Sequence, residues 1–439
     1  MTCLPRTLPP ELERSLRAAH CTAVPADQPG CHIELCSNSS HGFVAVTFDD
    51  GGPRSMLLRI GGPHPQTSLF RASAFGQAFV APFRLCETGE YTAHVRQLTH
   101  NSSDAFTAAV RTSKTRRVCA LHHRPRGIVL QRHAWMGRGG SVPCNQCLWG
   151  WHGGYPSTAA YGSLANLTLA PHPWSASLDL NFSALQHAHP SRHATLYREA
   201  IDERRNRRAG RPLCLVGDSH LRNLNNRLVS MTHGADVCNI FKAQRDHVTC
   251  TLRGSAFRYF ELHNEHSLTP STQPSTPYSR RAAPFSPTRM RRHNCSAVVA
   301  NLGHWLLGYT ALHPLEISQY RATLDRVLER LTTMARGAPV ALTAMNPHPL
   351  NGGGPRFATF PGNLHDQTRC PLKDQRLPHA IDAYNAVAAE RARAHGMPFL
   401  DSWQAALDLL DLSFDMRHYH DPVALATTVP ILSWWDSVD

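Results

Sequence analysis

Three short blocks of this sequence hold residue types that together could perform nucleophilic catalysis. In the first block, an apolar run ends in Gly-Asp-Ser at Ser219 and is followed by a segment with helical character. The second block, Asn-Leu-Gly-His-Trp, begins at Asn301, and the third holds Asp415 and His418 in an Asp-x-x-His spacing. A serine hydroxyl is a weak nucleophile until a neighbouring base accepts its proton, so residues from different blocks would have to meet in space.

Each of these residues has a definite role if the blocks do meet. Ser219 would be the nucleophile and His418 the base, and Asp415 would hold the other ring nitrogen of His418 and fix its tautomer. The backbone N–H of Ser219, at a helix start, and the side-chain amide of Asn301 would stabilise the oxyanion. Each block alone also has an ordinary explanation. The first fits a strand-to-helix turn with a capping serine, the second a plain turn, and the third a surface ion pair. Their combination favours catalysis.

Other residues of the three blocks are expected near the site. The site-lining set is Gly217, Asp218, His220, Arg222, Gly303 and Trp305. His304 is expected to be a packed loop histidine rather than a substrate contact. His420 is an alternative base, although its spacing from Asp415 fits less well than that of His418.

The sequence offers weaker candidates for a second oxyanion donor and for a metal site. A backbone N–H of Gly234 or Gly254 could be that donor, and the sequence leaves this open. Cys144-x-x-Cys147 lacks a second cysteine pair at zinc-site spacing, so a disulfide role is favoured there. We therefore expect no metal and no cofactor.

Strands and helices are predicted to alternate from residue 211 onward. Apolar runs predict strands at 212–217, 257–262, 297–303, 338–346 and 398–403. Helical periodicity predicts helices at 220–230, 316–335 and 378–395. Such alternation gives a parallel sheet with helices on both faces, and ligands bind outside the carboxyl ends of its strands. All three blocks follow predicted strands, so they are expected at that edge.

The front half of the chain has a different pattern. Residues 31–112 read as short strands separated by turns, which predicts an all-β immunoglobulin- or filamin-like sandwich. Residues 1–30 are expected to be an N-terminal extension. Residues 113–210 are expected to be an irregular Cys- and Trp-containing connection packed on a catalytic domain at 211–439. Within that domain, the Pro-, Ser-, Thr- and Arg-rich segment 266–293 predicts a disordered insertion.

The three blocks resemble a known hydrolase superfamily. "VGDSHLRN", "NLGHW" and "DMRHY" are similar to the motifs of SGNH/GDSL hydrolases, and more narrowly to those of the PC-esterase branch. That branch includes the trichome-birefringence-like polysaccharide O-acetyltransferases and the C-terminal domain of NXPE proteins, in which a β-sandwich also precedes the catalytic domain. The resemblance covers 211–439. It implies a flavodoxin-like three-layer α/β/α sandwich with a catalytic Ser219, His418 and Asp415.

The function that follows is a serine O-acyl (acetyl) esterase or O-acetyltransferase acting on glycans through a Ser219 acyl-enzyme. The transferase would also need an acyl donor. The alternative is a catalytically inactive secreted protein that binds glycans or proteins with a hydrolase-like fold. The net charge of +13 could suggest nucleic acid. However, the basic residues are nearly all arginine and lie in loop-like segments, so no nucleic-acid partner is expected.

Cysteines and glycosylation sequons bear on the compartment. The chain has 13 cysteines, and Asn-x-Ser/Thr sequons occur at Asn38, Asn101, Asn166, Asn181 and Asn294. Both features favour the secretory-pathway lumen (Golgi) or the extracellular space, although no signal peptide is readable. No apolar run is long enough to predict a transmembrane segment. Cys214, inside an apolar strand, is expected to be a buried free thiol.

Overall fold

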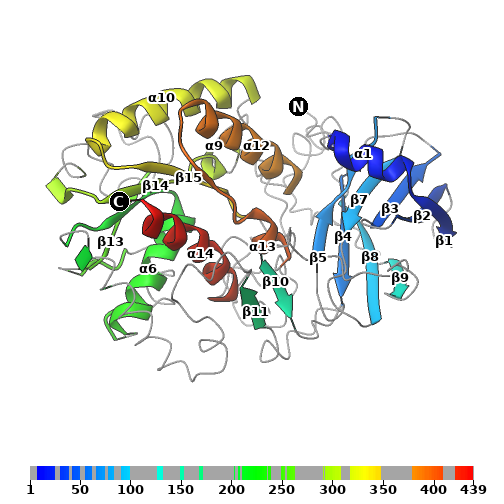
Figure 1. Cartoon of the computed structure of the whole chain (residues 1–439), viewed down its shortest axis with the longest axis horizontal. Coiled ribbons are helices and arrows are strands. Elements are labelled where there is room, and N and C mark those ends of the chain that lie inside the picture. The colour runs from blue at the N-terminus through cyan, green and yellow to red at the C-terminus, as the bar shows by residue number, and fades with distance from the viewer. Residues whose placement is uncertain are drawn as a thin grey trace, which may run out of the picture. The chain divides into compact units, whose positions relative to one another are not determined.

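Two units make up the described part of the chain. The structure, a computed structural model, describes residues 7–98, 126–131, 149–152, 168–171, 202–262, 290–307, 317–347, 378–408 and 421–438, with short gaps inside three of these ranges. One unit consists mainly of residues up to 172, and the other consists mainly of residues after that point. Figure 1 shows the elements of both.

The first unit is rich in antiparallel strands. Its elements are α1 (Pro10–Arg17), β1 (His20–Val24), β2 (Cys31–Ser37), β3 (Gly42–Phe48), β4 (Ser55–Gly61), β5 (Gln66–Leu69), β6 (Arg71–Ala72), β7 (Phe79–Phe83), β8 (Glu90–Leu98), β9 (Arg126–Gln131), β10 (Trp149–His152) and β11 (Thr168–Pro171). One sheet has the order β1-β2-β3-β7-β6 and a second has the order β5-β4-β8-β9, while β10 pairs with β11. Segment 1–30 thus contributes α1 and β1 to this unit, and β9 comes from the segment 113–210.

A single buried core joins the two larger sheets. Val44 and Phe48 of β3 pack in the same cluster as Leu58 of β4 and Val95 of β8. Each strand presents alternate residues to this core, as a half-buried sheet requires. The two sheets are therefore packed face to face. The immunoglobulin- or filamin-like assignment of this unit stays a prediction.

The second unit alternates strands and helices. The elements from residue 213 onward are β12 (Leu213–Gly217), α6 (Ser219–His233), β13 (Phe257–Glu261), β14 (Ala297–Ala300), α9 (His304–Leu307), α10 (Ile317–Ala335), β15 (Val340–Thr343), α12 (Pro378–Ala394), β16 (Phe399–Leu400), α13 (Trp403–Asp408) and α14 (Asp421–Ser437). Its sheet has the order β13-β12-β14-β15-β16, and every strand pair in it is parallel. Counted along the chain, that order is 2-1-3-4-5, the flavodoxin-like order. The predicted parallel α/β sheet is confirmed.

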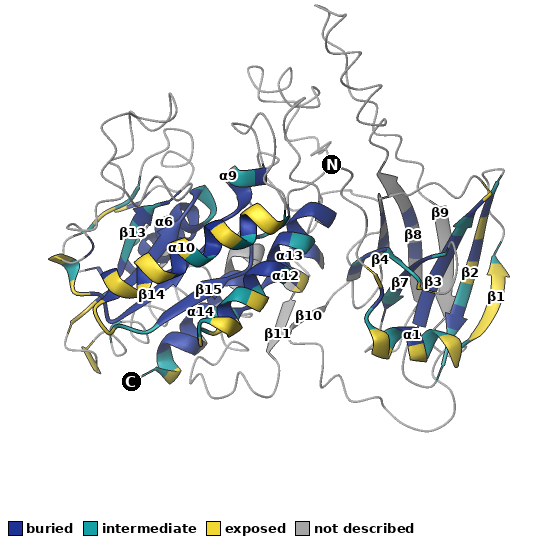
Figure 2. Ribbon diagram, turned by 90° about the horizontal axis from the view of Figure 1, so that it is seen from above, coloured by how far each residue is buried: buried dark blue, intermediate teal, exposed yellow. Residues whose placement is uncertain are grey.

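Helices cover both faces of this parallel sheet. Figure 1 shows α10 and α12 on one side of the strands and α6 and α14 on the other. Figure 2 shows β14 and β15 fully buried between them, with the exposed residues of α10 facing outward. On α10, Tyr320, Leu324, Val327, Leu328 and Leu331 are buried at the predicted helical spacing. The layers thus follow from amphipathic helices packed against a sheet whose central strands β12 and β14 are wholly buried and apolar.

Disulfides connect several described segments. Cys21–Cys36 joins β1 to β2, and Cys238–Cys250 closes the loop after α6. Cys214–Cys295 joins β12 to the chain just before β14. The prediction that Cys214 is a free thiol is wrong, because the neighbouring parallel strand begins just after Cys295. Disulfides persist in oxidising compartments, so these bridges favour a secreted or lumenal protein. Among the described residues, no helix is long and apolar enough to span a membrane.

Removing the Cys214–Cys295 bridge is expected to destabilise the second unit strongly. The cysteines are 81 residues apart, and loop-closure entropy for such a separation corresponds to about 4.5 kcal/mol of unfolding free energy. The variant C214A/C295A should therefore unfold at a clearly lower urea concentration. The control C238A/C250A removes a bridge of separation 12, for which the same relation gives about 3 kcal/mol. A larger loss in the control than in C214A/C295A would contradict the expectation.

Candidate active site

Polar side chains gather where β12 and β14 end. These strands are neighbours in the sheet although β13 lies between them in the chain. Such a point, where the strand order reverses, opens a crevice at the carboxyl edge of an α/β sheet and is the usual place for a ligand. Ser219 follows β12, and Asn301 follows β14. The backbone N–H of Asn301 donates to the carbonyl of Val216 at 2.9 Å, so the two strand ends stay paired up to the site.

The turn that carries Ser219 is held by two hydrogen-bonding side chains. Asp218 caps α6, its carboxylate accepting from the backbone N–H of His220 at 2.9 Å. The Tyr259 hydroxyl donates toward the carbonyl oxygens of Gly217 at 2.7 Å and Asp218 at 3.0 Å. Burial raises the pKa of Tyr259 well above its usual value, so the hydroxyl remains a donor. Ser219 is half-buried at the first residue of α6, with its N–H at the helix N-terminus.

Gly217 lets the two strand ends approach each other. A Cβ at this position would lie 2.9 Å from the Asn301 carbonyl oxygen and 2.9 Å from Cδ1 of Leu221. Both neighbours are buried, and one of them is backbone. The glycine of the Gly-Asp-Ser block is thus required by the packing of Asn301 against the end of β12.

Gly217→Ala is expected to push Asn301 away from the Ser219 turn. Overpacking of a close-packed site costs about 1–3 kcal/mol of unfolding free energy. Because the displaced backbone carries a candidate oxyanion donor, any ester turnover should fall by roughly tenfold or more. Urea denaturation and ester hydrolysis measure the two effects. Gly396→Ala is the control: its φ of +66° strains an alanine there, but its Cβ meets nothing within 4 Å, so it should lower stability without lowering turnover. Wild-type turnover in Gly217→Ala would contradict this account.

His304 and Asp218 form a buried pair across the two strand ends. Nδ1 of His304 lies 2.8 Å from Oδ2 of Asp218, and each side chain is 2% exposed. Nε2 of His304 lies 2.9 Å from the backbone carbonyl oxygen of Asn346. Both oxygens only accept, provided the carboxylate is ionised, so both ring nitrogens must donate. His304 therefore links the Ser219 turn to the chain after β15.

The charge state of Asp218 agrees with this geometry. Burial would raise the pKa of Asp218, but the charge and hydrogen bond of His304, with the charge and backbone N–H of His220, outweigh burial. Together they hold the pKa far below its ordinary value. The His220 ring stacks on His304 with centroids 4.1 Å apart. His304 is thus packed, as predicted, and its nitrogens are both occupied, so it cannot accept the proton of Ser219 in this arrangement.

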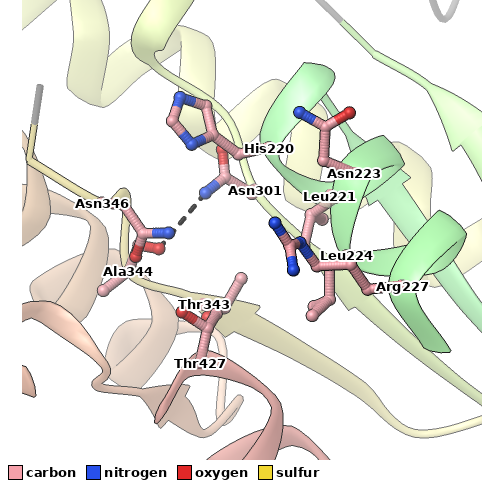
Figure 3. A pocket seen from close by; sticks show the side chains of 10 residues that line it. All are labelled: His220, Leu221, Asn223, Leu224, Arg227, Asn301, Thr343, Ala344, Asn346 and Thr427. Carbon is pink, nitrogen blue, oxygen red and sulfur yellow. Dashed lines mark hydrogen bonds between the residues drawn. The ribbon is translucent and has the colours of Figure 1, made fainter. Parts of the chain in front are cut away.

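A hollow lies beside this turn, between α6, β15 and α14. Its interior leaves about 30 Å³ for the centres of water-sized molecules, and the empty space is about 450 Å³ when the part open to solvent is included. Its lining residues are His220, Leu221, Asn223, Leu224, Arg227, Asn301, Thr343, Ala344, Asn346 and Thr427. Figure 3 shows side chains of α6 facing those of β15 and α14 across it. Burial lowers the pKa of Arg227 to about 10, so this guanidinium is still charged at neutral pH.

Asn301 has one amide hydrogen to spare in this arrangement. Its Nδ2 donates to the Ala344 carbonyl at 3.3 Å, drawn dashed in Figure 3. An amide nitrogen carries two hydrogens, so a second N–H remains for a ligand. Asn385 of α12 fixes the facing chain, accepting from the N–H of Met345 at 2.8 Å and donating to its carbonyl at 2.9 Å. The geometry is compatible with the expected oxyanion role.

The predicted site residues meet only in part within the described chain. Gly217, Asp218, His220 and Asn301 lie together at the strand ends, and His304 joins them. Arg222 is buried on α6 and is not among the residues that line the hollow. Its charge opposes the rise that burial causes in the pKa of Tyr259. Gly303 packs so closely that a Cβ would collide with Met345.

Several predictions fall outside the described residues. They concern Asp415, His418, His420, Gly254, Cys144, Cys147 and the segment 266–289, together with the side chain of Trp305. Gly234 is described, but it ends α6. The helix has 15 residues, which places Gly234 about 22 Å from Ser219. Gly234 is therefore excluded as a second oxyanion donor.

Sequence reasoning did not assign a role to several residues found here. Asn223 and Arg227 lie four and eight residues after Ser219, and helical periodicity would have placed them on a shared face. Tyr259 and Asn346 approach the site from β13 and from the chain after β15. No local pattern marks those two, because their contacts depend on strand order.

Comparisons with known proteins give weak structural likenesses. One similar structure is an acetyl xylan esterase, with 13% identity, 51% of this chain and 98% of that chain covered, and a TM-score of 0.27. Another is a putative GDSL-like lipase from Parabacteroides merdae, with 12% identity, 52% and 97% coverage, and a TM-score of 0.29. No protein-family model and no curated protein matches the chain. Likenesses this weak assign the chain to no family.

Proposed function

We propose that the α/β unit is a serine esterase or O-acetyltransferase of the SGNH type that acts on glycans. The observation that carries the proposal is the meeting of the Gly-Asp-Ser turn with Asn301 at the point where the strand order reverses. There Ser219 is the first residue of a helix, and the first backbone N–H groups of a helix make no hydrogen bond within it. The second amide N–H of Asn301 lies beside the same turn. This is the arrangement that acyl transfer needs.

The proposed first step forms an acyl-enzyme. Oγ of Ser219 attacks the ester carbonyl carbon while His418 accepts the hydroxyl proton. The carbonyl oxygen becomes an oxyanion that the N–H groups of Ser219 and Asn301 stabilise. When the carbon–oxygen bond to the alcohol breaks, the imidazolium of His418 gives its proton to the departing alkoxide. Asp415 orients the ring throughout.

The second step returns the enzyme to its starting state. His418 takes a proton from water, or from a sugar hydroxyl in a transferase, and the resulting nucleophile attacks the acyl carbon. The Ser219 ester then breaks and Oγ recovers the proton from His418. The esterase takes the acyl group from an acylated glycan and gives it to water, whereas the transferase takes it from a separate acyl compound and gives it to a sugar hydroxyl.

Position in the chain supports His418 as the base. His304, the histidine that the structure does bring to the turn, has both nitrogens occupied. His418 precedes the first residue of α14 by three positions, and α14 contributes Thr427 to the hollow that also contains Asn301. The third block is thus tethered to a helix that lines the site. The resemblance of the three blocks to the PC-esterase branch supports a glycan substrate. The disulfides support a protein of the secretory pathway.

Two assays test this function. The purified chain is incubated with 4-nitrophenyl acetate, and separately with an acetyl donor plus oligosaccharides. Release of 4-nitrophenol or acetylation of a sugar is expected. Covalent labelling by a fluorophosphonate probe, mapped to Ser219 by mass spectrometry, is expected in parallel. If the folded protein shows neither labelling nor turnover, the enzyme proposal is wrong and the inactive binding protein is the better hypothesis.

A further inference from the structure

Three asparagines that line the hollow carry buried amide atoms without hydrogen-bond partners among the described residues. Both amide atoms of Asn223 lack a partner, although the residue is 5% exposed. The side-chain oxygens of Asn301 and Asn346 also lack one. All three residues line the same hollow. Buried polar atoms are nearly always paired in native proteins, so a cluster of unpaired amides calls for a ligand that pairs with them.

The chemistry of these amides selects the ligand. Each unpaired oxygen can accept a hydrogen bond and the Nδ2 of Asn223 can donate, while the spare N–H of Asn301 is left to the oxyanion. A hydroxyl group both donates and accepts, so an amide can pair with it through either atom. Asn223 lies one helical turn after Ser219, at a Cβ separation of about 5–6 Å. That separation would bring its amide within reach of a group attached to Ser219, which precedes the first residue of the hollow's lining, His220.

We propose that Asn223, Asn301 and Asn346 form an amide-lined subsite for two neighbouring hydroxyl groups of a sugar ring. The ring is the one whose adjacent oxygen carries or receives the acyl group, so this inference rests on the proposed function. Leu221 and Leu224 line the same hollow from α6 and would pack against the apolar face of the ring. Asn223 is the member whose amide contributes least to the fold, because no group of the described residues bonds it.

The experiment measures sugar binding to a protein that cannot turn over. Full-length Ser219→Ala protein is screened against an array of oligosaccharides built from xylose, glucose, galactose, mannose and their uronic acids. A bound oligosaccharide is then titrated by calorimetry. Adding Asn223→Ala should weaken binding at least tenfold. A deoxy analogue lacking one of the two hydroxyls should bind at least fivefold more weakly to Ser219→Ala, and this penalty should shrink in the double variant.

Asn226→Ala, on the same helix, is the matched control. Its Oδ1 accepts from the backbone N–H of Cys250 at 2.8 Å, so this buried amide has a structural role. The control should lower the urea midpoint and leave sugar affinity unchanged. Asn223→Ala should do the reverse, because removing unpaired buried polar atoms leaves the urea midpoint equal or higher.

The outcomes separate this inference from the proposed function. If no oligosaccharide binds, or if Asn223→Ala binds as tightly as its parent, the hollow holds water alone and the subsite is overturned. If sugars bind through Asn223 but wild-type protein resists the fluorophosphonate probe, the subsite stands and the serine chemistry fails. If Ser219 is labelled but no sugar binds, the serine chemistry stands and the subsite fails.

Discussion

Ser219→Ala should lower ester turnover by roughly three orders of magnitude or more and abolish fluorophosphonate labelling. Removing a nucleophile from a catalytic triad leaves little beyond the contribution of oxyanion donors and binding. The unfolding free energy should stay within about 1 kcal/mol of wild type, since the change removes one oxygen at the first position of a helix. Initial rates with 4-nitrophenyl acetate and urea denaturation measure the two quantities.

Substitution of the two neighbouring histidines tests the rest of the triad. His418→Ala should reduce turnover about as much as Ser219→Ala does, and the double variant should be no worse than either, because the pair acts as a unit. His420→Ala is the control and should retain most of the activity. If His420→Ala is inactive and His418→Ala is not, the base has been assigned to the wrong histidine. Ser219→Ala activity near wild type would remove the acyl-enzyme altogether.

The strand–helix order of the second unit could be predicted because its signals are local. Each apolar run and each amphipathic stretch carries its own periodicity, so β12, α6 and α10 were predicted within a few residues of their observed bounds. The PC-esterase resemblance predicted the flavodoxin-like strand order, and local signals alone would have left it open. The placement of β12 between β13 and β14 then decides which blocks meet.

Contacts between distant residues were beyond local prediction. Asp218 and His304 are 86 residues apart, and their blocks were identified without any sign that these two side chains would pair. Cys214 was predicted to be a free buried thiol because the sequence of one strand does not show which residue of the neighbouring strand lies beside it. The register of Leu213 opposite Ala297 brings Cys295 to it. In both cases the missing information was strand adjacency, which no short segment contains.

Breaking the Asp218–His304 pair should strongly destabilise the second unit. Each partner is 2% exposed, and His304→Gln would leave the Asp218 carboxylate buried without its counter-charge. Losses of about 3–5 kcal/mol are typical when one member of a buried pair is removed. The double variant D218N/H304Q should cost less than His304→Gln alone, because asparagine is neutral and still caps α6. Urea denaturation of the two single variants and the double variant gives the coupling.

The pH dependence of the unfolding free energy of the same variants tests whether the charge of Asp218 causes this loss. In the wild type, the pKa of Asp218 is depressed below its ordinary 3.8. Its stabilising contribution is therefore complete above that value and is lost only as the pH falls through the lower, folded-state pKa. In His304→Gln the charge and hydrogen bond of His304 are lost and only those of His220 oppose burial. We therefore expect the pKa of Asp218 to rise above its ordinary value, and the variant to be least stable where the carboxylate must ionise. Its deficit relative to wild type should thus shrink between pH 6 and pH 4. A deficit that stays constant over this interval, or one unrelieved by Asp218→Asn, would mean that His304 acts through packing rather than through its charge.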